Sequence, residues 1–308
     1  MIEINGFINV YKPCGMTSNN AVVKVRGLLK HHTGNKNIKV GHVGTLDPGV
    51  DGVLLIAIGK AARLFQVLDK KKKVYLAQFT FGETTETLDT EGEVINKGNK
   101  VPTEEEIKSV LDKFQGYIEQ IPPPLSAINI NGVKAYKLVR HGIIPEMKSR
   151  QVYIEYIKLL SKDNENTFTF EIKCGGGTYI RSLSRDIAKE LGTVGYMSSL
   201  KRTKVGEFSI EDSATFDELN ADPDKYIVSV DEAVTQFDIP IIDMPEDIAI
   251  HCMNGIPEKC DNLPDGLFLV RYEGTILSLG YRTEDGKLAL KERLRWTLLN
   301  LKKDMTSH

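Results

Sequence analysis

The stretch of sequence that decides the fold is Gly41-His42-Val43-Gly44-Thr45-Leu46-Asp47-Pro48-Gly49, followed closely by an apolar run at residues 53–58. The apolar run predicts a buried strand, because it has the length of a strand and no polar side chain interrupts it. The glycines before it indicate a loop with unusual backbone angles. Asp47 has an ordinary explanation as the first residue of an Asp-Pro-Gly turn. His42 taken alone is most simply a packed or surface histidine.

Helices and strands are expected on both sides of this loop. Thr17 and Ser18 are typical N-caps, and the apolar residues after them recur at helical spacing up to about residue 32. Thr103 and Glu106 form a capping-box pattern, which predicts another helix start. Further helices are expected over 60–69, over 133–141 and from residue 178 to a stop at Gly192. Strands are expected over 74–81, 152–160 and 167–174.

The pattern of apolar runs and turn residues changes near residue 240. Beyond it, short apolar runs are separated by Pro, Gly and Asp turns, at 241–242, 266–272, 275–281 and 287–293. Helices and antiparallel-looking strands alternate irregularly before that point. The sequence therefore predicts an α+β protein with a mixed, mainly antiparallel sheet over 1–240, followed by a small β-rich module over 241–308.

Composition places the chain among globular proteins. It has 308 residues, of which 41% are hydrophobic and 27% are charged. No apolar run approaches the ~20 residues that a membrane helix needs, and the N-terminus lacks the pattern of a secretory signal. The four cysteines form no CxxC pair, so neither a disulfide framework nor a zinc site is predicted. We expect a cytoplasmic protein with no membrane partner.

The formal net charge of −2 argues against a nucleic-acid partner only until the charge is followed along the chain. Residues 1–75 carry a balance of +8 and end in Lys70-Lys71-Lys72-Lys73. Residues 207–270 carry a balance of −14, and we expect this acidic segment to connect the two parts of the chain. A four-lysine run is commonly a solvated helix end. The alternative is a polarised surface whose basic face attracts phosphates.

Motifs of several enzyme classes are missing from the sequence. It holds no HExxH pair, no Walker loop and no nucleophile elbow. These absences disfavour the zinc-protease, P-loop and serine-hydrolase classes.

Four longer motifs, in order and at matching spacing, resemble bacterial tRNA pseudouridine-55 synthases of the TruB type. The first is Lys12-Pro13-Cys14-Gly15-Met16-Thr17-Ser18 together with the loop quoted above. The second joins Lys73-Val74-Tyr75 to residues 81–89. The third covers residues 123–127 and 131–136, and the fourth joins residues 177–183 to Leu200-Lys201-Arg202-Thr203. The resemblance spans residues 6–212, and the terminal module is generally similar to a PUA-type RNA-binding domain.

The resemblance implies a role for each of six side chains. It makes Asp47 the catalytic aspartate and Arg181 the cation that keeps Asp47 ionised and oriented. Tyr75 would stack on the target base, Tyr179 would bond within the pocket, Leu200 would form an apolar wall, and His42 would fill the gap left by a flipped nucleotide. From the residues alone, Tyr75, Tyr179 and Leu200 would be assigned to the core and Arg181 to a helix surface.

The resemblance also implies the substrate, which is uridine 55 in the T arm of tRNA, and a reaction without cofactor or metal. We expect phosphate contacts from Lys12, Lys70, Lys71, Lys72, Lys73, Lys201 and Arg202 along a basic cleft. No obligate protein partner is expected, and we expect a monomer.

Three alternatives stay open at this point. The protein could act chiefly as a tRNA-folding chaperone, or as a guide-dependent subunit acting on ribosomal RNA, although it has no long basic tails. A glycoside hydrolase would need two carboxylates about the scissile bond. Only Asp47 lies in a matching motif, which disfavours that class.

Overall fold

The computed structural model describes residues 4–68, 71–237 and 239–294. These residues form a ten-stranded main sheet in which the path is β14-β1-β3-β12-β4-β11-β10-β7, with β2 paired to β3 and β13 to β12. The bounds are β1 (Gly6–Lys12), β2 (Val40–Val43), β3 (Asp51–Ile58), β4 (Lys73–Phe81), β7 (Gly116–Gln120), β10 (Arg150–Lys162), β11 (Thr167–Cys174), β12 (Gly195–Val205), β13 (Phe208–Ser209) and β14 (Val228–Ser229).

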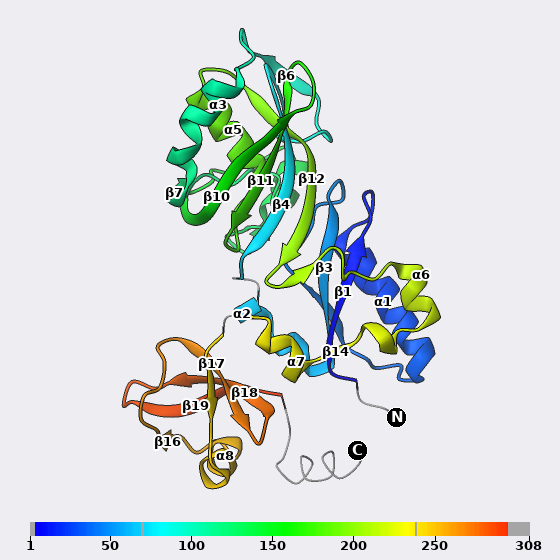
Figure 1. Cartoon of the computed structure of the whole chain (residues 1–308), viewed down its shortest axis with the longest axis vertical. Helices are drawn as coiled ribbons and strands as arrows, with labels where there is room; N and C mark the ends of the chain where they lie inside the picture. The colour runs from blue at the N-terminus through cyan, green and yellow to red at the C-terminus, as the bar shows by residue number, and fades with distance from the viewer. Residues whose placement is uncertain (1–3, 69–70, 238, 295–308) are drawn as a thin grey trace.

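Helices flank this sheet. Figure 1 shows α3 and α5 against the strands β4, β10 and β11, and α1 beside β1 and β3. The bounds are α1 (Ser18–Thr33), η1 (Gly59–Leu64), α2 (Phe65–Leu68), α3 (Glu104–Leu111), η2 (Asp112–Phe114), α4 (Ala135–Arg140), α5 (Ile180–Glu190), α6 (Phe216–Ala221), η3 (Asp224–Tyr226) and α7 (Val230–Thr235). The α+β class and the mainly antiparallel sheet are confirmed.

Local signals set the helix starts. The Thr17 side chain accepts from the N–H of Asn20 at the start of α1, and Thr103 and Glu106 form a complete capping box on α3. The helix expected over 60–69 is wrong in type, because the chain forms the 3₁₀ helix η1 and then only four α-helical residues. Asp69 lies outside the described residues.

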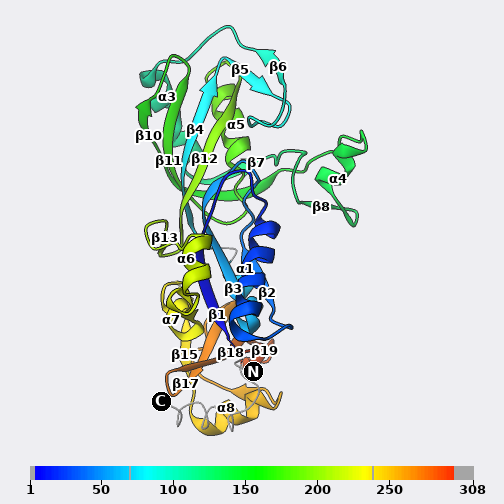
Figure 2. The ribbon, with the colours of Figure 1, turned by 90° about the vertical axis from the view of Figure 1, so that its right-hand side faces the viewer.

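Two hairpins stand away from the main sheet. One is β5 (Glu83–Thr85) with β6 (Val94–Lys97), and the other is β8 (Asn129–Ile130) with β9 (Val133–Lys134). The second hairpin and α4 form an arm that projects from the body of the molecule (Figure 2).

The junction between β3 and β12 lies inside the main sheet, as the third and fourth strands of its path. Strand β12 runs parallel to β3 over two residue pairs, Lys201 with Asp51 and Arg202 with Gly52. The other neighbouring strands along the path given above pair antiparallel. Gly52 has φ +110°, and a Cβ there would lie 2.2 Å from the carbonyl oxygen of Arg202. Only glycine permits this close approach, which brings the loop before β3 next to β4 and β12.

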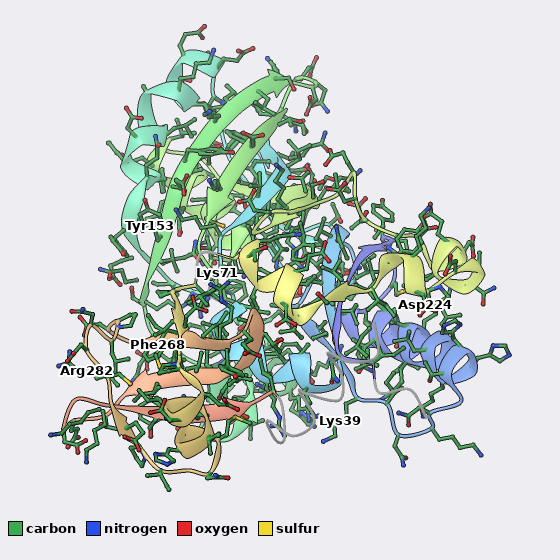
Figure 3. All side chains as sticks on the ribbon, turned by 60° about the horizontal axis from the view of Figure 1, so that its bottom comes forward. Lys39, Lys71, Tyr153, Asp224, Phe268 and Arg282 are labelled. Carbon is green, nitrogen blue, oxygen red and sulfur yellow. The ribbon has the colours of Figure 1, made fainter. Side chains whose placement is uncertain are left out.

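The acidic segment differs from its predicted role as a connection. It does not merely join two modules, because β14 pairs with β1 and Ala214 bridges to Val10. Asp224 also accepts from His32 at the end of α1, at 2.8 Å, and Figure 3 shows Asp224 beside that helix. The first part of the segment therefore contributes β13 and the edge strand β14 to the main sheet.

A second sheet follows, with the order β15-β17-β18-β19-β16. Its elements are β15 (Ile241–Asp243), α8 (Glu246–Met253), β16 (Glu258–Lys259), β17 (Leu267–Tyr272), β18 (Thr275–Arg282) and β19 (Lys287–Arg293). One hydrophobic cluster holds Phe7 and Leu55 of the main sheet together with Leu269 and Leu279 of the second sheet. The two sheets thus share a core, and the division at residue 240 stays a prediction.

Candidate active site

A cavity of about 230 Å³ lies where the loop before β3 meets β4, β12 and the start of α5. Its lining combines one carboxylate, two guanidinium groups, two tyrosines and several apolar side chains. The lining residues are Gly44, Thr45, Leu46, Asp47, Val50, Lys73, Tyr75, Ser126, Ala127, Gly175, Gly177, Thr178, Tyr179, Ile180, Arg181, Met197, Leu200 and Arg202. Asp47, Tyr75, Tyr179, Arg181 and Leu200, which lie far apart in the sequence, therefore share one cavity.

Asp47 occupies the first position of a turn. The N–H of Val50 donates to its backbone carbonyl at 3.1 Å, as an Asp-Pro-Gly turn requires. Its carboxylate serves another purpose, because Oδ2 accepts from Arg181 Nη2 at 2.9 Å. The Asp47 side chain remains 47% exposed and the Arg181 side chain only 7%. The aspartate is therefore held by a buried cation and still open to a ligand.

Arg181 is fixed from four directions. Besides Asp47 it contacts Asp89 Oδ2 through Nη1 at 3.2 Å, and it donates to the backbone carbonyls of Thr87 and Leu125 at 3.1 and 3.0 Å. Asp89 in turn accepts from the Thr87 hydroxyl and from the N–H of Glu91. Such forked bonding sets the plane of the guanidinium and hence the direction of the Asp47 carboxylate.

Asp89 is a site residue that sequence reasoning missed. It stands at the end of the second motif, to which no role was assigned beyond the resemblance. The signal available in the sequence is that the second motif holds this acidic residue close to Thr87, whose carbonyl accepts from Arg181. Asp89 does not line the cavity, so the described part of the cavity wall contains a single carboxylate.

The segment after β1 braces the loop over residues 44–50, which we call the Asp47 loop. The Ser18 hydroxyl accepts from the N–H of Leu46 and donates to the carbonyl of the same residue, both at 2.9 Å. The N–H of Gly15 donates to the carbonyl of Pro48 at 2.9 Å. The first motif lies about thirty residues before the loop in the sequence. These bonds bring it into the same site.

Lys12 belongs to this brace, and its predicted phosphate contact is wrong. The side chain is fully buried, and Nζ donates to the carbonyls of Met16, Pro13 and Pro48 at 2.6, 3.0 and 3.4 Å. Burial lowers the pKa of this amine from its ordinary value. A group enclosed by three carbonyls has no path to an RNA backbone.

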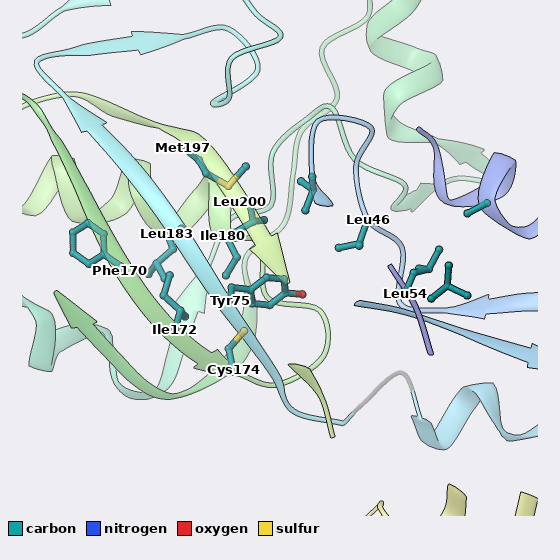
Figure 4. Close-up of a cluster of buried hydrophobic side chains, with 14 of the residues drawn as sticks. Leu46, Leu54, Tyr75, Phe170, Ile172, Cys174, Ile180, Leu183, Met197 and Leu200 are labelled. Atoms are coloured by element: carbon teal, nitrogen blue, oxygen red, sulfur yellow. The ribbon is translucent and has the colours of Figure 1, made fainter. Parts of the chain in front are cut away.

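Tyr75 forms the apolar wall of the cavity together with Leu200 and Met197. Tyr75 and Leu200 are 7% and 8% exposed. Figure 4 shows the Tyr75 ring extending from β4 with its hydroxyl directed to the side on which Leu46 lies. Burial raises the pKa of the Tyr75 hydroxyl to about 12, against the opposing effect of the nearby Arg202 charge. The ring thus offers a flat apolar face with a protonated hydroxyl.

Tyr179 is the N-cap residue of α5 and is half-buried in the cavity wall. Its backbone is held by Gln120, whose side chain accepts from the Tyr179 N–H at 2.8 Å and donates to the Tyr179 carbonyl at 3.2 Å. The guanidinium of Arg150 lies 4.8 Å from the centre of the Tyr179 ring. This stacking fixes the ring plane.

Arg202 is buried in the site, and its predicted place on an RNA-binding surface is wrong. The residue is 1% exposed and faces the cavity from within. Its Nε donates to the carbonyl of Val53 at 2.8 Å, and Nη2 donates to the carbonyl of Gly44 at 2.9 Å. The side chain cannot reach a phosphate of the RNA backbone, because β3 and the Asp47 loop enclose it.

The remaining basic residues do not form one face. Lys73 lines the site cavity. Lys71 and Lys72 line a larger cavity of about 770 Å³ with Val74 and Leu76, whose side chains alternate with Tyr75 along β4 and so lie on the opposite face of the sheet. Lys201 is partly exposed and pairs with Asp51 at 3.4 Å. Lys70 lies outside the described residues, and the single polarised basic surface is not found.

His42 lies on β2, directly opposite Ile56 of β3, and is half-buried. It precedes the Asp47 loop but does not line the cavity. Its role in the RNA stays a prediction.

The described residues offer neither a metal site nor a membrane helix. Within them, no three His, Cys, Asp or Glu side chains are grouped to hold a metal ion. No helix among the described elements is both long and apolar enough to cross a membrane.

Comparison with known proteins gives consistent matches over most of the chain. Residues 30–180 match the family model "TruB family pseudouridylate synthase (N terminal domain)", and residues 181–235 match "tRNA pseudouridylate synthase B C-terminal domain". A tRNA pseudouridine synthase B of Clostridium kluyveri is 38% identical over 88% of this chain and 93% of its own length. One of Bacillus velezensis is 44% identical over 70% of both chains.

Solved structures give the same fold. A chain in the crystal structure of a Cbf5-Nop10-Gar1 complex matches with a TM-score of 0.72 and 25% identity, over 94% of this chain and 85% of the other. A chain in a structure of an H/ACA RNP bound to a substrate RNA matches with a TM-score of 0.69 at 23% identity, which supports the fold alone.

Proposed function

Because this chain belongs to the TruB family of pseudouridylate synthases, we propose that it isomerises uridine 55 in the T loop of tRNA to pseudouridine, with Asp47 as the catalytic carboxylate. Enzyme status, as an isomerase that forms pseudouridine, follows from the family. The observation that carries the finer proposal is the pair formed by Asp47 and Arg181 in the wall of the cavity.

The chemistry suits a single, oriented anion. Breaking the N1–C1′ bond builds positive character at C1′, which a carboxylate can stabilise or trap, or relieve by taking the C2′ proton. The ring then turns and rebonds through C5. Arg181 holds the Asp47 carboxylate in one direction in each of these versions. The step uses no cofactor or metal.

Tyr75, Leu200 and Tyr179 are proposed to hold the uracil ring. Tyr75 and Leu200 provide buried apolar surface in the cavity wall, and Tyr179 provides a hydroxyl at that wall. A uridine in a folded arm can enter this cavity only after leaving its stack, at a cost of a few kcal/mol. We propose that His42, next to the Asp47 loop, occupies the vacated position in the RNA.

Binding of the tRNA arm is proposed to use Lys71, Lys72, Lys73 and Lys201 for phosphate contacts. Neutralising any one of these lysines should weaken binding and flatten its dependence on salt. Lys73 is 4% exposed and its Nζ donates to the carbonyl of Lys71 at 3.2 Å, whereas the Lys72 side chain is 53% exposed, so we expect Lys72→Gln to reduce this dependence more than Lys73→Gln does. Location in the cytoplasm and the monomeric state remain predictions.

The test uses the purified protein and an unmodified tRNA transcript without guide RNA or added protein. Pseudouridine at position 55, and none in a transcript with cytidine there, is expected. A protein that binds the transcript but never modifies it favours the chaperone alternative. Modification that needs an added guide favours the guide-dependent alternative. The glycoside-hydrolase alternative needs a second carboxylate about the bond, and the described cavity wall holds only Asp47.

Replacing Ser18 by alanine is expected to slow turnover while tRNA affinity is kept. The change removes both bonds that hold Leu46 and leaves a buried N–H and carbonyl unsatisfied, which costs about 1–3 kcal/mol of stability. Urea unfolding and single-turnover rates measure the two effects. Ser278→Ala is the matched control, because Ser278 is also buried and bonds a carbonyl, in the second sheet. Equal rates for both variants would contradict the bracing role.

The pH–rate profile should contain no limb due to ionisation of Tyr75 between pH 7 and about 9.5. A raised tyrosine pKa stabilises the protonated form, so this hydroxyl adds stability that is complete below its ordinary pKa of 10.0 and is lost as pH rises towards about 12. Tyr75→Phe should therefore lower the rate without changing the shape of the pH–rate profile. A limb in the wild-type profile below pH 10 that disappears in Tyr75→Phe would contradict this assignment.

A further inference from the structure

Arg202 carries a buried positive charge that no carboxylate of the described residues contacts. The residue is 1% exposed, and its guanidinium donates to two backbone carbonyls, those of Val53 and Gly44, and is a hydrogen-bond partner of the Tyr75 hydroxyl. Among the described ion pairs, no Asp or Glu oxygen lies within 4.0 Å of this group. Buried arginines are ordinarily paired with a carboxylate, because an unpaired charge is costly to remove from water.

The other guanidinium of the cavity is different in this respect. Arg181 contacts two carboxylates, those of Asp47 and Asp89. Its charge is therefore already compensated before a ligand enters. The charge of Arg202 remains available to an anion that forms inside the cavity.

The backbone holds Arg202 in a fixed place. On one side it is the register partner of Tyr75 in β4, and on the other side that of Gly52 in β3. The close approach at Gly52 leaves no room for a side chain between the strands. A charge fixed in this way needs no rearrangement when a negative charge develops beside it.

The proposed reaction creates such a negative charge. When the N1–C1′ bond breaks, its electron pair stays on N1 and spreads over the ring to O2 and O4, while C1′ bonds to an Asp47 oxygen or loses its neighbouring C2′ proton to it. When C5 later bonds to C1′, the C1′–Asp47 bond breaks or the proton returns to C2′. The C5 proton then leaves to a base, and N1 takes up a proton. The detached uracil is thus an anion held against Tyr75.

We propose that Arg202 is a further catalytic residue, whose fixed positive charge stabilises the uracil anion released by cleavage of the N1–C1′ bond. The inference rests on the proposed function, since it concerns an intermediate of that reaction. Asp47 and Arg181 act on the sugar side of the broken bond, and Arg202 acts on the base side. The influence of Arg202 on the neighbouring Tyr75 hydroxyl, whose pKa it lowers against the effect of burial, supports their proximity.

The experiment compares two substrates that differ in how stable their base anion is. T-arm stem-loops carry either uridine or 5-fluorouridine at the target position, and single-turnover consumption of the target nucleoside is followed for wild type, Arg202→Gln and Arg202→Lys. Fluorine at C5 withdraws electrons and stabilises the ring anion without help from the protein. Thermal unfolding and stem-loop binding confirm that each variant is folded.

The expected result is a loss of about 10²-fold or more for Arg202→Gln on uridine, the scale for removing a preorganised donor, and a loss at least several-fold smaller on 5-fluorouridine. Arg202→Lys keeps the charge and should stay closer to wild type on both. Arg185→Gln is the control, because Arg185 also donates to a backbone carbonyl, that of Ile121, and does not line the cavity.

Equal losses on the two substrates would show that Arg202 only holds the loop, and would overturn the proposal. A folded, RNA-binding Arg202→Lys variant that loses about 10²-fold or more on uridine would overturn it as well, and this arm remains decisive if the glutamine variant fails to fold. If wild type consumes neither substrate, the proposed function itself fails and the inference with it. Normal wild-type turnover with an unimpaired Arg202→Gln variant refutes the inference alone.

Discussion

Asp47→Asn and Asp47→Ala are expected to abolish pseudouridine formation while the affinity for tRNA stays near that of wild type. The loss should reach roughly 10⁴-fold or more, the scale observed when a catalytic nucleophile is removed. The physical reason is that asparagine fits the same turn and can still accept from Arg181, but it carries no charge for C1′ and cannot take a proton. Single-turnover formation of pseudouridine and filter binding of the transcript measure the two quantities.

The matched control for this prediction is Asp51→Asn. Asp51 lies four residues further along, accepts from the Tyr11 hydroxyl at 2.6 Å and does not line the cavity. This variant should lose some stability and keep most of its rate. Substantial turnover by Asp47→Asn, or an equal loss in both variants, would remove Asp47 from its assigned role.

Arg181→Met should reduce both turnover and stability. It leaves the carboxylates of Asp47 and Asp89 without their shared cation and frees the carbonyls of Thr87 and Leu125. Breaking a buried pair by removing one partner costs about 3–5 kcal/mol, and because Asp47 is half exposed we expect the lower end of this range. Turnover should fall by about 10²–10³-fold, because the carboxylate is no longer oriented. Urea unfolding and kcat measure these effects.

Two further variants separate charge from geometry at this position. Arg181→Lys keeps a positive charge but cannot form the fork to two carboxylates, so its rate should lie between those of wild type and Arg181→Met. Arg185→Met, one turn later on α5, removes an arginine whose partners are Asp186 and the carbonyl of Ile121. An Arg181→Met enzyme within threefold of wild type, or an Arg185→Met enzyme equally impaired, would contradict the account.

Much of the fold could be predicted because local signals were strong. The cap at Thr17, the capping box at Thr103 and the apolar run that became β3 were recognised from residues a few positions apart. The short runs of the second sheet were recognised in the same way. In each case the side chains that stabilise the element are close in sequence to the element itself.

The strand β12 could not be predicted, although it is central to the main sheet. Its sequence is rich in polar residues, and two β-bulges, near Met197 and near Arg202, interrupt the alternation that identifies a strand. The first irregularity lets Met197 and Leu200, which are three residues apart, line the same cavity.

The resemblance names residues that the structure brings to one cavity, although their roles stay predictions, whereas the charge count alone names residues that do not share one face. The structure places Asp47, Arg181, Tyr75, Tyr179 and Leu200 around one cavity, as the resemblance led us to expect. Lys12 and Arg202 lie in basic stretches, which lead us to expect phosphate contacts from both. Nothing in the sequence shows that backbone carbonyls from distant loops enclose them.

The most direct measurement of the central claim is the mapping of pseudouridine in tRNA from cells that lack this protein. The account predicts that uridine remains unmodified at position 55, that the intact gene restores the modification, and that the Asp47→Asn gene, expressed at the same level, does not. Full modification at position 55 in the deletion strain, with no other enzyme responsible, or restoration by Asp47→Asn, would contradict it.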